Sequence, residues 1–189
     1  MPAPAGGRRP GPRRSLTEAD VLDAALSLLD AGGAPAVSVR GIAAKVGVAP
    51  NAVYTYFPDK AAVVRALVDR VLGEATPDAA ADRGRPWRER VEAVALDLRA
   101  HLSAHPGAVG LVVGDPLDGP HARALDRHLR DLLADAGLSL DAAAGGAHLL
   151  LAHVLGSIAL EAGEQPPGTD RYRWELRRLL DGLAGERSA

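Results

Sequence analysis

The amino-acid sequence predicts an all-α fold in two parts, a small N-terminal helix-turn-helix domain and a larger C-terminal helical domain. Leu, Val and Ile recur at the three- and four-residue spacing of helices from residue 21 to residue 183. Beyond residue 86, no stretch shows the apolar and polar alternation that is typical of strands. The stretch Ser38 to Lys60 holds two short helical patterns separated by Gly47.

Length and composition are those of a globular protein with one or two domains. The chain has 189 residues, of which 47% are apolar and 24% are charged, enough for a buried core. It has no cysteine, which excludes disulfides and thiolate metal sites, and its basic N-terminus is not followed by the apolar run of a secretion signal. We therefore expect a cytoplasmic protein.

Positive charge collects in the N-terminal part. The net charge of −2 gives no reason by itself to expect a nucleic-acid partner. Residues 1–75, however, contain nine Lys or Arg against seven Asp or Glu, whereas residues 76–189 contain thirteen against seventeen. Residues 1–14 are rich in Pro and Gly and carry four arginines, which predicts a flexible basic arm. Such an arm either keeps the protein soluble or lies along DNA phosphates.

The first helix has a clear start. Thr17 and Asp20 have the spacing of a capping box, and Leu16 and Val21 are placed for a hydrophobic staple. Apolar residues then recur at helical spacing until Gly32-Gly33, where we expect the helix to end.

Two short helices and a tight turn follow. Ser38 is a good N-cap, and Gly47 stands where a helix ends in a left-handed residue. Pro50 suits the first position of the second helix, and Pro58 stops that helix after two turns. Helices this close must cross steeply, which is the helix-turn-helix unit that offers its second helix to the DNA major groove.

The next helix follows Pro58-Asp59, runs for about fourteen residues and links this unit to the rest of the chain. Residues 73–86 read as a loop and mark the boundary between a domain of residues 15–75 and one of residues 86–185. The second domain is predicted from five apolar patterns: a helix from Trp87 to Leu102, a short apolar turn at Ala108–Val113, a helix from Leu125 to Leu133 closed by Gly137, a long helix from Leu140 to Ala162, and a last helix from Trp174 to Leu183.

The second helix of the unit separates an apolar side from a polar one. Val53 and Phe57 share one face, while Asn51 and Thr55 point the other way. Asn can pair with adenine, and Ala and Thr methyl groups can touch thymine, so this side suits base reading, while Tyr and cationic side chains suit phosphates. The candidate DNA contacts are Arg14, Thr17, Ser38, Val39, Arg40, Pro50, Asn51, Ala52, Tyr54, Thr55, Tyr56 and Lys60.

These residues closely resemble the signature of the tetracycline-repressor (TetR) family of bacterial transcriptional regulators. Ile42-Ala43, Gly47-Val48, the run Tyr54 to Phe57 and Lys60 stand in the family's register over about residues 15–75. The resemblance implies that the second helix enters the major groove, that Tyr54 and Lys60 contact phosphates, and that Arg40, Asn51, Ala52, Thr55 and Tyr56 face DNA. The sequence departs from the family at two positions, with Ala49 where Ser is usual and Asn51 where Gly is frequent.

The C-terminal part looks more loosely like the C-terminal domain of the tetracycline repressor. The similarity lies in Trp87, the segment Leu102 to Ala108, Gly114 with Pro116, and the long helix near the end of the chain. It implies an effector-binding and dimerisation domain. No match to the magnesium-tetracycline ligand set is present, so the effector remains an unknown small molecule.

The long apolar helix has two interpretations. Residues 142–160 include no Asp, Glu, Lys or Arg, which is close to the length of a membrane span. Its histidines, serine and glycines, with flanks poor in Lys and Arg, favour burial between two copies of the chain over a membrane. The candidate dimer contacts are Leu151, Val154, Leu155, Ile158, Trp174, Leu176 and Leu180.

A mixed apolar and polar face of the helix after Trp87 is the candidate effector site. His101 and His105 have the spacing of a metal pair, but no third ligand is evident, so no metal or other cofactor is predicted. The candidate effector residues are Trp87, Val94, Leu98, His101, His105, Leu111 and His148. The same residues could equally form plain core.

The sequence thus predicts a homodimeric regulator that represses from a near-palindromic operator on double-stranded DNA and is released by a small ligand. A transcriptional activator, or an effector-independent DNA-binding protein of the same fold, is the alternative. An enzyme is not expected, because the sequence offers neither a nucleophile constellation nor a Gly-rich phosphate loop.

Overall fold

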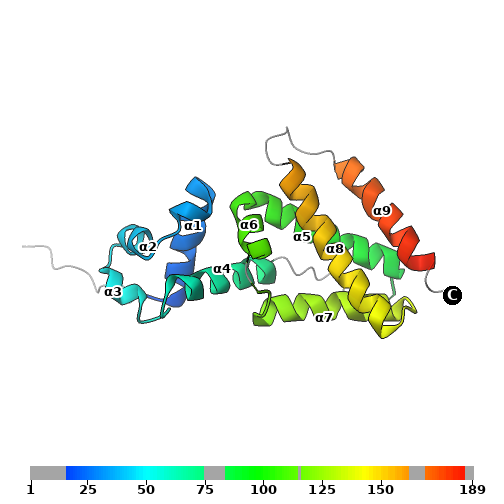
Figure 1. The fold of residues 1–189 in the computed structure, drawn as a ribbon, viewed down its shortest axis with the longest axis horizontal. Helices are drawn as coiled ribbons and strands as arrows, with labels where there is room; N and C mark the ends of the chain where they lie inside the picture. Colours follow the sequence, from blue (N-terminus) through cyan, green and yellow to red (C-terminus); the bar gives the residue numbers. More distant parts are fainter. Residues whose placement is uncertain (1–15, 75–83, 115, 162–168, 186–189) are drawn as a thin grey trace, which may run out of the picture.

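The structure, a computed structural model, describes residues 16–74, 84–114, 116–161 and 169–185. These residues form helices and short connections, with no strand among them. Figure 1 shows a small head of α1, α2 and α3 at one end and a larger helical body at the other, with α4 running between them. The predicted all-α fold and its two parts are confirmed. The helices are α1 (Glu18–Ala36), α2 (Val39–Val46), α3 (Pro50–Val53), α4 (Lys60–Glu74), α5 (Trp87–Ala104), α6 (Pro106–Gly114), α7 (Pro120–Asp135), α8 (Leu140–Glu161) and α9 (Thr169–Gly185).

Helix α1 starts as predicted and ends later. The Thr17 hydroxyl accepts from the amide of Asp20 at 3.2 Å, and the Asp20 carboxylate accepts from the amide of Thr17 at 2.9 Å, so the capping box is formed. Gly33 has φ of 69°, a left-handed value that bends the helix, and one further turn continues to Ala36. The glycine pair therefore kinks the element where the sequence predicted its end.

The caps of α2 are those predicted, but α3 is shorter than expected. Ser38 accepts from the amide of Gly41 at 3.0 Å, and Gly47 has φ of 81° at the other end. Helix α3 spans four residues rather than two turns, and Ala49 provides no side-chain cap for it. The chain continues as a tight turn in which the carbonyl of Val53 accepts from the amide of Phe57 at 3.1 Å.

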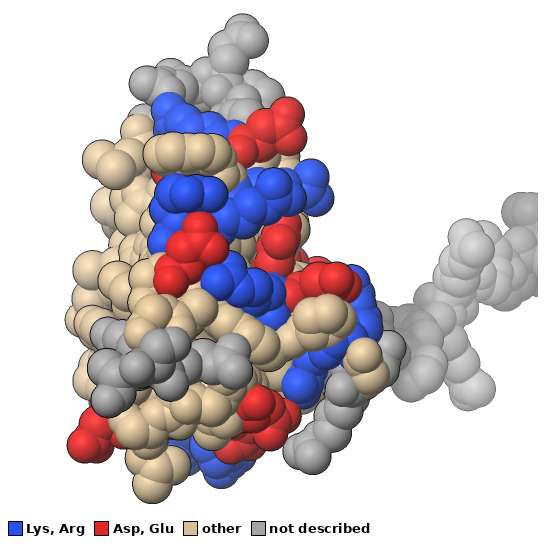
Figure 2. Space-filling model, turned by 90° about the vertical axis from the view of Figure 1, so that its right-hand side faces the viewer, with Lys and Arg blue, Asp and Glu red and all other residues tan. Residues whose placement is uncertain are grey.

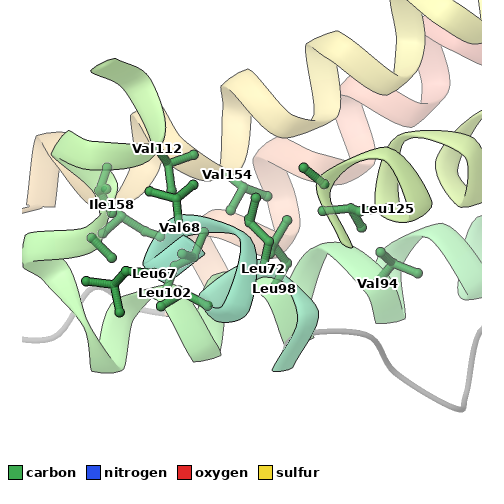
Figure 3. Packing of buried hydrophobic residues seen from close by; sticks show 14 of the residues in the cluster. Leu67, Val68, Leu72, Val94, Leu98, Leu102, Val112, Leu125, Val154 and Ile158 are labelled. Carbon is green, nitrogen blue, oxygen red and sulfur yellow. The ribbon is translucent and has the colours of Figure 1, made fainter. Parts of the chain in front are cut away.

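Helix α4 belongs to the head and to the body at once. Its first turn is capped by Asp59, whose carboxylate accepts from the amide of Ala62 at 2.7 Å. Toward its other end, Leu67 and Leu72 are buried among side chains of α5, α6, α7 and α8, as Figure 3 shows. Head and body therefore share one hydrophobic core, and a displacement of α4 must be felt in both.

The body surrounds α5 with α7, α8 and α9. The segment after His105, expected as a short apolar turn, is the nine-residue helix α6, which packs against α1 and α8. Helix α8 is, among the described residues, the one long and apolar enough to cross a membrane by length and composition, a test that the core helix of a soluble protein also passes. Its buried side chains, such as Leu150 and Val154, pack inside the chain.

The outer face of α9 is covered with paired charges. Figure 2 shows arginine and carboxylate side chains interleaved on the end of the molecule that the body forms. Arg88 lies 2.7 Å from Asp181, and Arg173 lies 3.8 Å from Glu92, so two of these pairs join α9 to α5. Exposed pairs of this kind add little stability, about 0–1 kcal/mol each.

Candidate DNA-reading head and effector cavity

The reading segment presents polar side chains outward from a small apolar base. Val53 and Phe57 are buried, as the helical pattern predicted, whereas Asn51 and Thr55 are exposed. Tyr54 is 49% exposed. Because α3 is a single turn, the two buried side chains hold the segment in place more than its own backbone hydrogen bonds do.

The two tyrosines of this segment differ in their surroundings. The Tyr56 hydroxyl donates a hydrogen bond to the carbonyl of Leu16, two residues before α1 begins. The Tyr54 hydroxyl has no hydrogen-bond partner within the described part of the chain. Tyr54 is therefore the freer donor toward a phosphate, and Tyr56 fixes the reading segment on α1.

The other predicted DNA contacts divide into free side chains and caps. Arg40 and Lys60 are exposed and form no ion pair with any described residue, so both can face phosphates. The hydroxyls of Thr17 and Ser38 already cap α1 and α2. Of the remaining predicted contacts, Pro50 is exposed, Val39 and Ala52 are partly buried, and Arg14 lies outside the described residues.

A cavity lies in the body between α4, α7 and α8. Its volume is about 190 Å³. It adjoins an open groove of about 410 Å³ along α8, and the two share Leu117, His148 and Leu151. The side chains that line the cavity are Leu72, Leu117, Ala122, Leu125, Asp126, Arg130, Ala147, His148 and Leu151. A mostly apolar wall with a few polar groups is the usual form of a small-molecule site.

Of the predicted effector residues, the structure brings only His148 to this cavity. Val94 and Leu98 are fully buried in the shared core. His101 lies 3.7 Å from Glu74 of α4, and His105 lies 3.0 Å from Asp30 of α1. Trp87 and Leu111 are partly buried and line neither the cavity nor the groove.

The predicted face of α5 therefore packs in the shared core and, at His101, against α4, and it lines neither the cavity nor the groove. The cavity is lined instead by residues that the sequence does not single out as effector contacts, among them Leu117, Ala122, Leu125 and Arg130, because their spacing indicates only a loop and the core face of a helix.

The predicted dimer contacts also divide. Leu151 and Leu155 line the open groove, and Trp174 is 62% exposed. Leu149 and Leu160, on the same helix as the groove, are exposed as well. Four of the predicted contacts are buried inside the single chain, where they hold α8 and α9 to the body: Val154, Ile158, Leu176 and Leu180. Their side chains are therefore not exposed to a second copy.

A polar cluster is buried beneath α9. Arg99 contacts the carboxylate of Glu161, donates to the Ser157 hydroxyl at 3.2 Å and lies over the ring of Tyr172. Burial raises the pKa of Tyr172, which stacks on His153. Burial lowers the pKa of His153, and the nearby charge of Arg99 lowers it further against the opposing effect of Glu175. The body is thus held partly by charges removed from water.

A capped helix-turn-helix head that shares a helix and a core with a larger cavity-bearing helical domain is the architecture of a DNA-binding regulatory protein. Comparison with protein families agrees. Residues 21–67 match the model described as bacterial regulatory proteins, tetR family, and residues 80–184 match that of the tetracyclin repressor-like C-terminal domain. The second match alone covers more than half of the chain, and the chain belongs to the TetR family.

Relatives and solved structures support this assignment. The chain is 34% identical over 119 residues to the HTH-type transcriptional repressor DrrR1 of Streptomyces coeruleorubidus, which covers 61% of this chain and 43% of that protein. It is 32% identical over 148 residues to an HTH-type transcriptional regulator of Saccharopolyspora erythraea, covering 78% of this chain and 61% of that one. The chain thus spans less than two thirds of either relative.

The crystal structure of BioQ with its natural double-stranded DNA operator superposes with a TM-score of 0.77 at 27% identity, covering 90% of this chain and 99% of that one.

Proposed function

We propose that this protein is a ligand-responsive transcriptional repressor that acts as a homodimer in the cytoplasm and leaves its operator when a small molecule enters the body. The observation that carries this proposal is the position of α4. Lys60 at its start lies in the reading head, and Leu72 near its end lines the cavity. Occupation of the cavity and placement of the head are therefore linked through one rigid element.

DNA reading falls to the exposed segment around α3. Asn51, Ala52 and Thr55 are the candidates for base contacts, because an Asn amide can pair with the edge of adenine and a methyl group can touch thymine. Arg40, Tyr54 and Lys60 suit phosphate oxygens, which fix the register of the head without reading sequence. The operator complex of BioQ, at 27% identity, supports such a placement.

The proposed contact between two copies is the open groove along α8, together with the exposed apolar side chains beside it. Leu151 and Leu155 line the groove, and Leu149, Leu160 and Trp174 stand exposed on α8 and α9. Paired α8 and α9 helices from two copies would bury these side chains in a four-helix interface. The two heads would then meet half-sites about 34–36 Å apart, or a multiple of that spacing.

The effector proposed for the cavity is a small, mostly apolar molecule with at least one polar group. Leu72, Leu117 and Leu125 offer apolar contact. The polar groups of the wall are His148 and the pair Arg130–Asp126, whose atoms lie 2.7 Å apart. A ligand that binds better when the heads are displaced must weaken DNA binding, and bound DNA must weaken ligand binding by the same factor. The coupling free energy between two such sites is about 1–3 kcal/mol in typical cases.

Site selection with purified full-length protein and random double-stranded DNA tests the proposal. We expect enrichment of a near-palindromic sequence and complexes that contain two chains. Recovery of DNA without any sequence preference would contradict a repressor and indicate a general DNA-coating protein. Screening small molecules for release of the selected DNA then tests the effector part separately.

A further inference from the structure

Asp69 of α4 holds the start of α7. Its Oδ1 accepts hydrogen bonds from the amides of His121 and Ala122 at 2.9 and 3.0 Å. Its Oδ2 lies 2.8 Å from Nδ1 of His121. The Asp69 side chain is 13% exposed. One carboxylate thus satisfies two of the unpaired amides at a helix N-terminus, although it belongs to another helix far away in the sequence.

Two glycines permit this approach. A Cβ atom at Gly119, which immediately precedes α7, would overlap the Asp69 carboxylate. A Cβ atom at Gly73, one turn after Asp69, would lie 2.6 Å from the His121 ring. Gly119 therefore admits no side chain while Asp69 stays in place, and a side chain at Gly73 would have to displace the His121 ring. We call Asp69, Gly119, His121 and the first turn of α7 the latch.

The latch lies directly beside the cavity. Ala122, whose amide Asp69 holds, lines the cavity, as does Leu125 one turn further along α7. Leu72, three residues after Asp69 on α4, lines it from the other helix. A molecule in the cavity would therefore contact both of the helices that the latch joins. The other end of α4 carries Lys60 and the reading head.

We propose that the Asp69 latch is the joint through which the cavity controls the reading head. Asp69 acts as a positioning residue: with the latch closed, α4 and the head are held at the angle that suits the operator, and a filled cavity opens the latch and releases that angle. This inference rests on the proposed function, because it requires that the protein binds an operator and that the cavity governs this binding.

A cavity-filling variant replaces the unidentified effector in the test. Ala147 of α8 is buried and lines the cavity, so Ala147→Leu fills it from the side opposite the latch. The latch is opened by Gly119→Ala and, more mildly, by Asp69→Asn. Matched controls are Gly110→Ala, where a Cβ atom meets no neighbour, and Asp97→Asn on the exposed surface of α5.

The measurement is affinity for the selected operator in a double-mutant cycle, with thermal unfolding and affinity for unrelated DNA recorded for every variant. We expect Ala147→Leu to weaken operator binding about tenfold in the wild-type and control backgrounds, within the usual range of allosteric coupling. Gly119→Ala and Asp69→Asn should each weaken it by a similar factor and leave binding to unrelated DNA unchanged. Adding Ala147→Leu to either should then change operator affinity less than about twofold.

If the losses of operator affinity in the single variants simply multiply in the double variants, the cavity and the latch act independently. That result would overturn the proposed role of the latch. A cap with a structural role alone would lower the unfolding temperature and leave the factors multiplicative. Ala147→Leu without effect in the wild-type background would overturn the cavity as the control site, and the latch with it. Failure of the wild-type chain to bind any selected DNA would instead overturn the proposed function itself.

Discussion

The head and the body of this protein differ in how far their candidate functional residues are exposed to solvent. In the head, Asn51, Thr55 and Tyr54 are exposed, and short-range caps such as that of Ser38 hold the backbone beneath them. In the body, mostly apolar side chains from α4, α7 and α8 line the cavity, and a charged cluster around Arg99 is buried. A surface that reads DNA must be open, whereas a site that senses a small molecule must exclude water.

The largest effect is expected at the proposed contact between two bodies. Leu155→Asp places a charge in the apolar groove and should give monomers, whose operator affinity falls to that for unrelated DNA, at least about a thousandfold. Sedimentation and operator titration measure the two effects. The matched control is Ala134→Asp on the exposed side of α7. A variant that stays dimeric would show that the groove faces something other than a second copy.

The next largest effect is expected for the buried charges of the body, compared with the exposed charges on its surface. Arg99 and Glu161 are only 8% and 5% exposed, so Arg99→Ala leaves the carboxylate with Arg171 alone. We expect a loss of about 3 kcal/mol in the free energy of unfolding, measured with urea. Arg88→Ala, which removes an exposed pair with Asp181, should cost less than about 1 kcal/mol. Equal losses of unfolding free energy in the two variants would show that the buried and the exposed ion pair contribute alike.

In the head, one substitution should alter sequence reading and another should not. Asn51→Ala is expected to cost about 1–3 kcal/mol in operator binding and to relax the preference at one base pair. Lys60→Ala should weaken all sequences alike and reduce the dependence of binding on salt. Titrations against a set of single base-pair changes separate the two. A uniform loss with Asn51→Ala would reassign that side chain to the phosphates.

The smallest effect concerns acid. Burial lowers the pKa of His153 in the folded chain below the ordinary value of 6.5. At a pH between the lowered pKa and 6.5, His153 is therefore protonated in the unfolded chain and neutral in the folded chain. Unfolding free energy should therefore fall as the pH drops below about 6.5, with a flattening below the lowered pKa. His153→Gln should lose less stability than the wild type between pH 7 and pH 5, by urea unfolding at both. An unchanged difference between the two pH values would show that His153 does not contribute.

The difference between head and body also explains what the sequence could predict. The caps of Thr17 and Ser38 and the left-handed Gly47 depend on neighbours within three or four residues, so local patterns identified them. The sequence overestimates the length of α3, because Pro58 marks only the latest point at which a helix must stop, whereas α3 ends at Val53. Local signals were therefore sufficient for the caps and for the separation of buried Val53 and Phe57 from exposed Asn51 and Thr55, but not for every helix end.

The body could not be predicted to the same depth. A helical wheel groups Val94, Leu98 and His101 on one face of α5, but it does not say which neighbour that face meets. The structure buries Val94 and Leu98 in the shared core and places His101 3.7 Å from Glu74 of α4. The cavity is formed by residues such as Leu72, Leu117 and His148, which are far apart in the chain. Nothing in a single sequence states that such residues meet.

The hydrogen bond from Tyr56 to the carbonyl of Leu16 has a consequence for how long the protein stays on DNA. Leu16 is two residues after Arg14, the last of the four arginines in residues 1–14, which lie outside the described residues, so the bond fixes the point of the head to which that stretch is joined. Once the head is docked, any arginine contact with phosphate forms within the same complex, at an effective concentration that is about millimolar for a short tether. Individually weak contacts can then delay departure, and we expect the arm to act on the dissociation rate more than on the association rate.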